Sequence, residues 1–359
     1  MALNATFSDP PQLDTRFPRV SIVGVGCKGN YVVSRIFENG GSGAQCVAVN
    51  SDNNSLEHTY SHERVLIRRD AAHDIAELSD NRTGEETIQE CASLISPLLT
   101  GADIAFIVVG TADASELTIA TTSANVARRI GAITVGVAMI PSDSEGIDGP
   151  VVPHGLTRMR RSCDTLAIVA SGRSAQLSEC PSLLDVHSAD QQTIDIVSGL
   201  SQALACPSAV NIEFSAFREL MTQGGIAHVG MGYSTSVLRV EEATIGALRG
   251  PLLYDSIMRC RGALVNVRGD SSLTVEEAEI AAQLVMEREG WNAPVVMGTL
   301  VDESWYDGCQ VSILLTGAVY PYIPSGYRRL PLDMDEMETD GEDEGSVKLE
   351  LELDQLERS

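Results

Sequence analysis

The sequence predicts an α/β protein: a parallel-sheet, Rossmann-like nucleotide-binding domain, a long central helix, a smaller mixed α+β domain and a disordered acidic C-terminal tail. Three observations carry this prediction. Short β-branched runs alternate with helical segments in the first half. One long helical pattern then interrupts that alternation. The chain of 359 residues, 43% of them hydrophobic, is large enough to bury about two cores.

The first half contains short apolar runs rich in Val and Ile, which are typical of strands buried on both faces. The expected strands are Val20–Val25, Cys46–Asn50, Ile104–Val109, Ile133–Val137, Thr165–Val169 and Ala209–Phe214. The segments between several of them have a helical apolar period: Tyr31–Glu38, Glu85–Leu99 and Glu116–Ile130. The alternation indicates a mainly parallel sheet with helices on both faces.

The second half has a different rhythm. We expect an N-terminal arm at 1–17, the nucleotide-binding domain at 18–188, the central helix at 189–206, the second domain at 207–320 and the tail at 321–359. Within the second domain the patterns predict strands Leu264–Arg268, Val295–Leu300 and Val311–Thr316, and helices Arg239–Leu248 and Thr274–Glu289.

The tail is strongly acidic. From Leu332 to Ser359 it holds twelve acidic and two basic residues, a composition that cannot bury a core. Its end, Val347–Leu353, alternates apolar with mostly charged residues. This segment is either a peptide that docks on a division or membrane-anchor protein by strand addition, or a solvated tail.

Charge and cysteine usage exclude several classes. Fifty acidic residues oppose 25 basic ones, and Lys28 and Lys348 are the only lysines, so nucleic acid is not an expected partner. An acidic surface poor in lysine indicates a halophilic source, an archaeon. The eight cysteines are scattered without metal spacing, so no metal site is predicted. No apolar run is long enough to span a bilayer, so we expect a cytoplasmic protein without direct membrane insertion.

A glycine-rich turn follows the first strand and opens the first helix: Gly24-Val25-Gly26-Cys27-Lys28-Gly29. Glycines at such a turn let the backbone approach a phosphate at a helix N-terminus. Asp52 follows the next strand, where a ribose-binding acid would lie. Taken alone, this motif also permits an NAD(P)-dependent oxidoreductase.

The rest of the chain resembles the tubulin/FtsZ superfamily, and the FtsZ branch in particular. The resemblance runs from about Pro18 to Val319. The segments that carry it are Gly24–Asn30, similar to G-V-G-G-G-G-N; Ala48–Asp52, similar to A-V-N-T-D; Gly101–Asp103 through Gly131–Val137; Asp164–Leu166; and Asn211–Phe214, similar to N-L-D-F. No dehydrogenase offers that coverage, which favours the FtsZ-like reading.

The resemblance implies a GTP/GDP site. Its residues would be Gly24, Gly26, Cys27, Lys28, Gly29, Asn30, Asn50, Asp52, Gly110, Glu145 and Asp190. Asp190 stands at the position that reads the guanine edge.

One part of the implied site is degenerate. The family's phosphate loop is G-G-G-T-G-T-G, and the matching positions here are Ala112, Asp113, Ala114, Ser115, Glu116, Leu117 and Thr118. A carboxylate about 5 Å from a phosphate costs about 3 kcal/mol at an effective dielectric near 20, or roughly a hundredfold in affinity. We therefore expect GTP/GDP binding to be weak or absent. Asp113, Ser115 or Glu116 could instead cap the helix and fill the anion position.

Two further departures concern Lys28 and the hydrolysis loop. Lys28 could reach a phosphate, or it could pair with Asp113 or Glu116; we favour the ion pair. The family's loop that enters a neighbour's site carries two acids. Here the weak catalytic candidate is Glu213, and Ala216 replaces the second acid.

The resemblance implies a divergent FtsZ-like scaffold or regulator of cell division or the cytoskeleton, and the departures from the family pattern predict a pseudo-GTPase with little or no hydrolysis. It would associate end to end with itself or with a conventional FtsZ. The alternative is an active GTP-hydrolysing filament protein that uses the surviving turns and Asp190.

Overall fold

The computed structural model describes residues 17–40, 43–67, 81–111, 113–140, 151–170, 189–222, 224–249, 260–288, 291–305 and 308–317. The predicted N-terminal arm and the predicted acidic tail lie outside these residues. The described strands form one ten-stranded sheet in the order β3-β2-β1-β4-β5-β6-β7-β10-β8-β9.

The first seven strands of this order are parallel. They are β1 (Val20–Val25), β2 (Gln45–Asn50), β3 (Glu63–Leu66), β4 (Ile104–Gly110), β5 (Ile133–Ile140), β6 (Thr165–Ala170) and β7 (Gly225–Ser234). Every residue of β1, β4 and β5 is buried. Parallel strands covered on both faces need apolar side chains in both directions, which explains their uninterrupted apolar runs.

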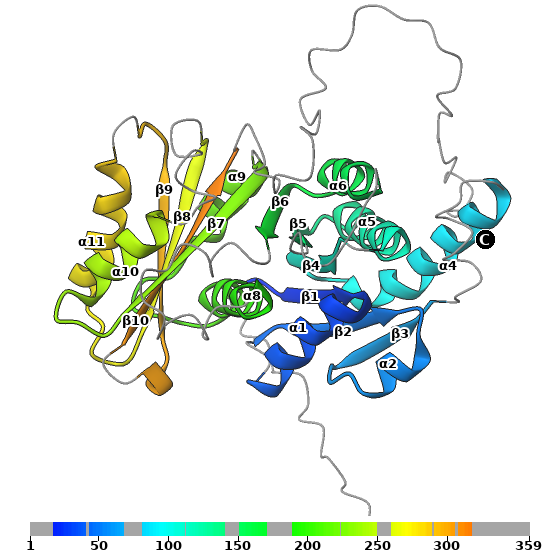
Figure 1. The fold of residues 1–359 in the computed structure, drawn as a ribbon, viewed down its shortest axis with the longest axis horizontal. Helices are drawn as coiled ribbons and strands as arrows, with labels where there is room; N and C mark the ends of the chain where they lie inside the picture. The colour runs from blue at the N-terminus through cyan, green and yellow to red at the C-terminus, as the bar shows by residue number, and fades with distance from the viewer. Residues whose placement is uncertain are drawn as a thin grey trace, which may run out of the picture. The chain divides into compact units, whose positions relative to one another are not determined.

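Helices cover both faces of the parallel part (Figure 1). On one face lie α4 (Asn81–Leu99), α5 (Ala114–Arg129) and α6 (Val151–Ser162), and on the other α1 (Gly26–Glu38) and α8 (Ala189–Ala205). The short α2 (Asn53–Glu57) packs beside β2 and β3. The central helix was predicted correctly, and its buried Ile194, Val197 and Leu200 share a core with Leu264 and Leu314 of the second half.

The second half is mixed, as predicted. β10 (Cys309–Thr316) pairs antiparallel with β7 and β8 (Gly262–Gly269), whereas β8 and β9 (Val295–Val301) are parallel. The helices α10 (Arg239–Leu248) and α11 (Val275–Met286) pack on β8 and β10 around a second apolar core. A short 3-10 turn, η5 (Glu303–Trp305), precedes β10.

The predicted strand Ala209–Phe214 is wrong. Only Val210 joins the sheet edge, by hydrogen bonds with Thr299, and the helix α9 (Phe214–Thr222) begins at Phe214. Residues 209–213 form neither strand nor helix, and Phe214 opens a helix whose Phe217, Leu220 and Met221 are buried. The strand that continues the sheet is β7.

None of the helices within the described ranges is long and apolar enough to cross a membrane. The sheet is continuous because β6 pairs with β7, so one set of strands carries both halves.

Close packing of α10 on β7 generates a stability prediction. A Cβ added at Gly232 on β7 would lie 1.8 Å from the carbonyl oxygen of Ala243, whereas one added at Gly246 on α10 would lie 3.5 Å from the Cα of Gly232. We expect Gly232→Ala to lower the free energy of unfolding by about 2–3 kcal/mol, because backbone must move. The matched control Gly246→Ala should be neutral or stabilising by up to about 1 kcal/mol. Urea unfolding measures both, and equal effects would contradict the packing.

Candidate functional site

The pairing of β1 with β4 positions the candidate site. Val25 pairs with Val109 in the parallel register, so the next residues, Gly26 and Gly110, lie at the same edge of the sheet. The helix α1 starts at Gly26, directly after β1, and α5 starts at Ala114, shortly after β4. The N-terminal ends of two helices therefore meet where the glycine turn was predicted.

The glycine turn is held by two close approaches. A Cβ at Gly24 would stand 2.3 Å from the carbonyl oxygen of Gly29, so no side chain fits between them. Gly26 has φ 71°, in the left-handed region that side-chain-bearing residues rarely adopt. These constraints keep the backbone of the turn tight.

The space above Gly26 is occupied by a carboxylate from another helix. Glu116 of α5 accepts a hydrogen bond from the backbone N–H of Cys27, with 3.2 Å between N and Oε1. A Cβ at Gly26 would lie 1.9 Å from the Cδ of Glu116. The expectation that an acid of the degenerate loop fills the anion position is therefore met by Glu116, although it caps α1 rather than its own helix.

The position of Glu116 changes the pKa of its carboxyl group. Burial raises the pKa of Glu116 to about 7, the Cys27 N–H opposes the rise, and the charge of Asp113 adds to it. Protonated and ionised Glu116 are therefore both populated near neutral pH.

The N-terminus of α5 is capped by its own acid. Asp113 Oδ1 accepts hydrogen bonds from the backbone N–H and the hydroxyl of Ser115, each at 2.7 Å. Leu117 is buried, and the hydroxyl of Thr118 donates to the carbonyl oxygen of Ala114. One backbone donor at this helix end, the Ser115 N–H, is thus bonded within the turn.

Lys28 pairs with Asp190, so the expected pairing with Asp113 or Glu116 is wrong. Its Nζ lies 3.2 Å from Oδ2 of Asp190, in the first turn of α8. The stem of Lys28 runs along Gly110, which directs the ammonium across to α8 and away from α5. The acid expected to read guanine is therefore engaged by the lysine.

Three predicted binding residues, Asn30, Asn50 and Asp52, form hydrogen bonds within the protein. The buried Asn30 bridges to Val49 of β2: its Nδ2 donates to the carbonyl oxygen and its Oδ1 accepts from the N–H, each at 3.2 Å. Asn50 accepts from the N–H of Asp52, and Asp52 caps α2 through the N–H of Asn54. These contacts hold α1, β2 and α2 in place.

The candidate catalytic acid lies away from this cluster. Glu213 precedes α9, follows the C-terminal end of α8 and accepts a hydrogen bond from the Ser215 hydroxyl. Asp190 is in the first turn of α8, whose 17 residues span about 25 Å. Glu213 and the neighbouring Ala216 are therefore separated from the glycine turn by the length of this helix.

Two predicted site residues, Ala112 and Glu145, lie outside the described residues. Among the residues that are described, no group of three or more His, Cys, Asp or Glu side chains is arranged to hold a metal ion.

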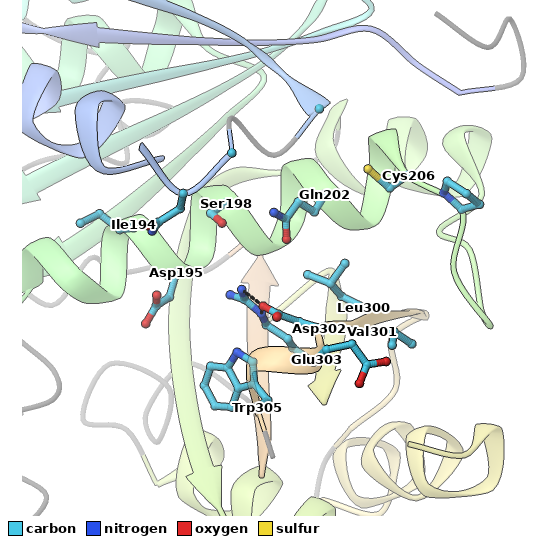
Figure 2. A pocket seen from close by; sticks show the side chains of 15 residues that line it. Ile194, Asp195, Ser198, Gln202, Cys206, Leu300, Val301, Asp302, Glu303 and Trp305 are labelled. Carbon is cyan, nitrogen blue, oxygen red and sulfur yellow. Dashed lines mark hydrogen bonds and ion pairs between the residues drawn. The ribbon is translucent and has the colours of Figure 1, made fainter. Parts of the chain in front are cut away.

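A separate cavity of about 850 Å³ lies beside α8 (Figure 2). Asp195 and Gln202 line it from α8, and Asp302 and Trp305 line it from the other side. Arg268, which also lines it, pairs with Asp302 and lies over the ring of Trp305. None of the predicted site residues that the structure describes lines this cavity. The sequence held no signal for it, because its walls come from separate segments at 39–43, 194–207, 268 and 300–305.

Asn30 should be important for stability. We expect Asn30→Ala to lower the free energy of unfolding by about 2–3 kcal/mol, because two backbone groups of Val49 lose a buried partner. The control Asn53→Ala removes an exposed 2.7 Å hydrogen bond to Glu57 and should cost less than about 1 kcal/mol. Chemical denaturation of the two variants tests this, and equal losses would contradict the bridge.

Glu116 should make stability depend on pH. Its pKa is raised from the ordinary 4.5 to about 7, so the folded state binds more protons between these values. Stability should therefore fall as pH rises through this window. Relative to Glu116→Gln, the wild type should lose on the order of 2 kcal/mol between pH 5 and pH 8. Parallel curves of unfolding free energy against pH would show that Glu116 is not buried as described.

The chain is similar to proteins of one family over most of its length. The Tubulin/FtsZ family GTPase domain matches residues 19–172, and the FtsZ family C-terminal domain matches residues 225–319. "Cell division protein FtsZ 1" of Pyrococcus horikoshii is 30% identical over 307 residues, which cover 85% of this chain and 82% of that protein. The protein of the same name from Methanocaldococcus jannaschii is 29% identical over 320 residues, or 88% of each chain.

Solved structures agree with the family match. An FtsZ mutant from M. jannaschii is 30% identical with a TM-score of 0.75, covering 84% of this chain and 92% of that chain. CetZ2 from Haloferax volcanii, a GTPγS-bound protofilament, has a TM-score of 0.61, covers 84% of this chain and 94% of that chain, and at 20% identity is similar in fold alone. The chain belongs to the Tubulin/FtsZ family.

Proposed function

We propose that this protein is a cytoplasmic FtsZ-like scaffold or regulator in cell division or the cytoskeleton, and that it hydrolyses little or no GTP. It associates end to end with itself or with a conventional FtsZ. The names of its relatives support the division role, and an FtsZ dimer among the similar structures supports self-association.

One observation carries the lack of hydrolysis: the loop after α8 has lost one of its two acids. Ala216 offers a methyl group where a carboxylate would polarise water. The remaining Glu213 is bonded to the Ser215 hydroxyl, which occupies one of its oxygens. Since α8 separates Glu213 from the glycine turn, only a second copy stacked end to end could bring the two together.

Two contacts support weak nucleotide binding. Lys28 engages Asp190, which would otherwise read the guanine edge. Asp113 satisfies the N-terminus of α5, which would otherwise hold phosphate. The alternative, an active GTP-hydrolysing filament protein, is favoured by the match to the GTPase domain.

Phosphate release measured alongside light scattering, with and without GTP, separates the two functions. We use multimolar KCl, because the acidic, lysine-poor composition favours a halophilic source. Scattering should be the same with and without GTP, and phosphate should stay at the level of nucleotide alone. Adding a conventional FtsZ tests co-assembly.

The control variant is Glu213→Gln. For a scaffold without hydrolysis, this change should leave phosphate release at background, whereas for an active GTPase it should lower the rate at least tenfold. Phosphate release that requires GTP and rises with protein concentration would contradict the proposal, as would micromolar GTP binding by titration calorimetry.

A further inference from the structure

The Glu116 carboxylate lies where a bound anion would lie at the start of α1. Besides its hydrogen bond to the Cys27 N–H, its Oε2 is 3.9 Å from the position a Cβ would take at Gly110. The half-buried carboxylate thus lies between the ends of β1 and β4. It comes from α5, 89 residues further along the chain.

The α1 end has no other anionic partner among its own residues. The N-cap residue Val25 makes no side-chain cap, and the first turn of α1 carries no acid. A helix of 13 residues carries a partial positive charge at its N-terminus and leaves backbone N–H groups free. Glu116, which is distant in the sequence, therefore provides the hydrogen-bond acceptor and the negative charge that a local cap or a ligand would provide.

The glycine turn is tight and has the Glu116 carboxylate against it. Gly24 closely approaches the backbone of Gly29, Gly26 has a positive φ, and the atoms nearest to a Cβ at Gly26 belong to Glu116. At the start of α5, in contrast, Asp113 of the turn itself accepts a hydrogen bond from the Ser115 N–H.

Among the described residues, Asp113 on α5 repels the Glu116 carboxylate, and the Cys27 N–H on α1 attracts it. Lys28 on α1 turns its ammonium to Asp190 on α8. Partial burial raises the pKa of Glu116 to about 7.

We infer that Glu116 is an internal anionic ligand that keeps the phosphate cradle of the glycine turn closed, so that the cradle is latent and accepts nucleotide phosphates once this one side chain is removed. This inference rests on the proposed function, which identifies the site as a nucleotide site, and it names Glu116 as the residue that controls phosphate binding there.

Calorimetric titration with GTP and with inorganic pyrophosphate at pH 8 tests this. The variants are Glu116→Ala, which empties the cradle; Glu116→Gln, which keeps the side-chain volume without the charge; and the control Asp113→Asn, which removes a neighbouring charge but leaves the cradle occupied. Glu116→Ala should bind GTP at least tenfold more tightly than the wild type. Asp113→Asn should differ less than threefold from the wild type.

Alkylation of Cys27 gives a second readout at the same place. Cys27 is exposed and adjoins the cradle, so its labelling by iodoacetamide can be followed by peptide mass spectrometry. GTP should slow the labelling in Glu116→Ala and leave the wild-type rate unchanged. Circular dichroism melting checks the fold, and if Glu116→Ala does not fold, Glu116→Gln replaces it with a smaller expected gain of at least threefold.

Equal gains in Glu116→Ala and Asp113→Asn would overturn the inference, since repulsion by charge alone would then explain exclusion. An absence of gain in a folded Glu116→Ala or Glu116→Gln would overturn it as well. In that case the proposed function stands if the wild type releases no phosphate. Tight GTP binding and phosphate release by the wild type would instead remove the proposed function.

Discussion

The parallel pairing of β1 with β4 is the constraint on which the site depends. Because Val25 lies opposite Val109, the glycine turn and the turn after β4 leave the sheet at neighbouring points. Two helix N-termini then converge, each with unbonded N–H groups. Convergent helix ends attract anions, and in this protein the side chains Glu116 and Asp113 supply them.

Several polar groups around the turn have internal partners. Glu116 caps α1, Asp113 caps α5, Asp52 caps α2, and Asp190 pairs with Lys28. The Lys28 pair is half-exposed and contributes little stability.

Two groups of predicted site residues lie at opposite ends of the central helix. Asp190 and its partner Lys28 lie at the N-terminal end of α8, and the loop with Glu213 and Ala216 follows its C-terminal end. The sheet and the cores around α8 connect these two ends. In the function proposed above, the residue changes at both ends weaken nucleotide binding and hydrolysis, while the architecture of the family is kept.

Local patterns predicted most of the fold. Buried parallel strands such as β1 and β4 read as continuous apolar runs, so their positions were predicted within a residue. The prediction failed at Ala209–Phe214, where Val and Ile favoured a strand but residues 209–213 form neither strand nor helix and α9 begins at Phe214. Tertiary burial overrides such local preferences.

The sequence by itself determined the residue identities on which the proposed loss of hydrolysis rests: side chains in place of glycines at 112–118, and Ala216 in place of a second acid. Only the tertiary structure decided which side chain fills which position. Charge alone allowed Lys28 to pair with Asp113, Glu116 or Asp190, and the choice fell on a residue 162 positions away. Such choices follow from strand register and from the direction in which each helix projects its side chains, and neither is encoded in a local stretch of sequence.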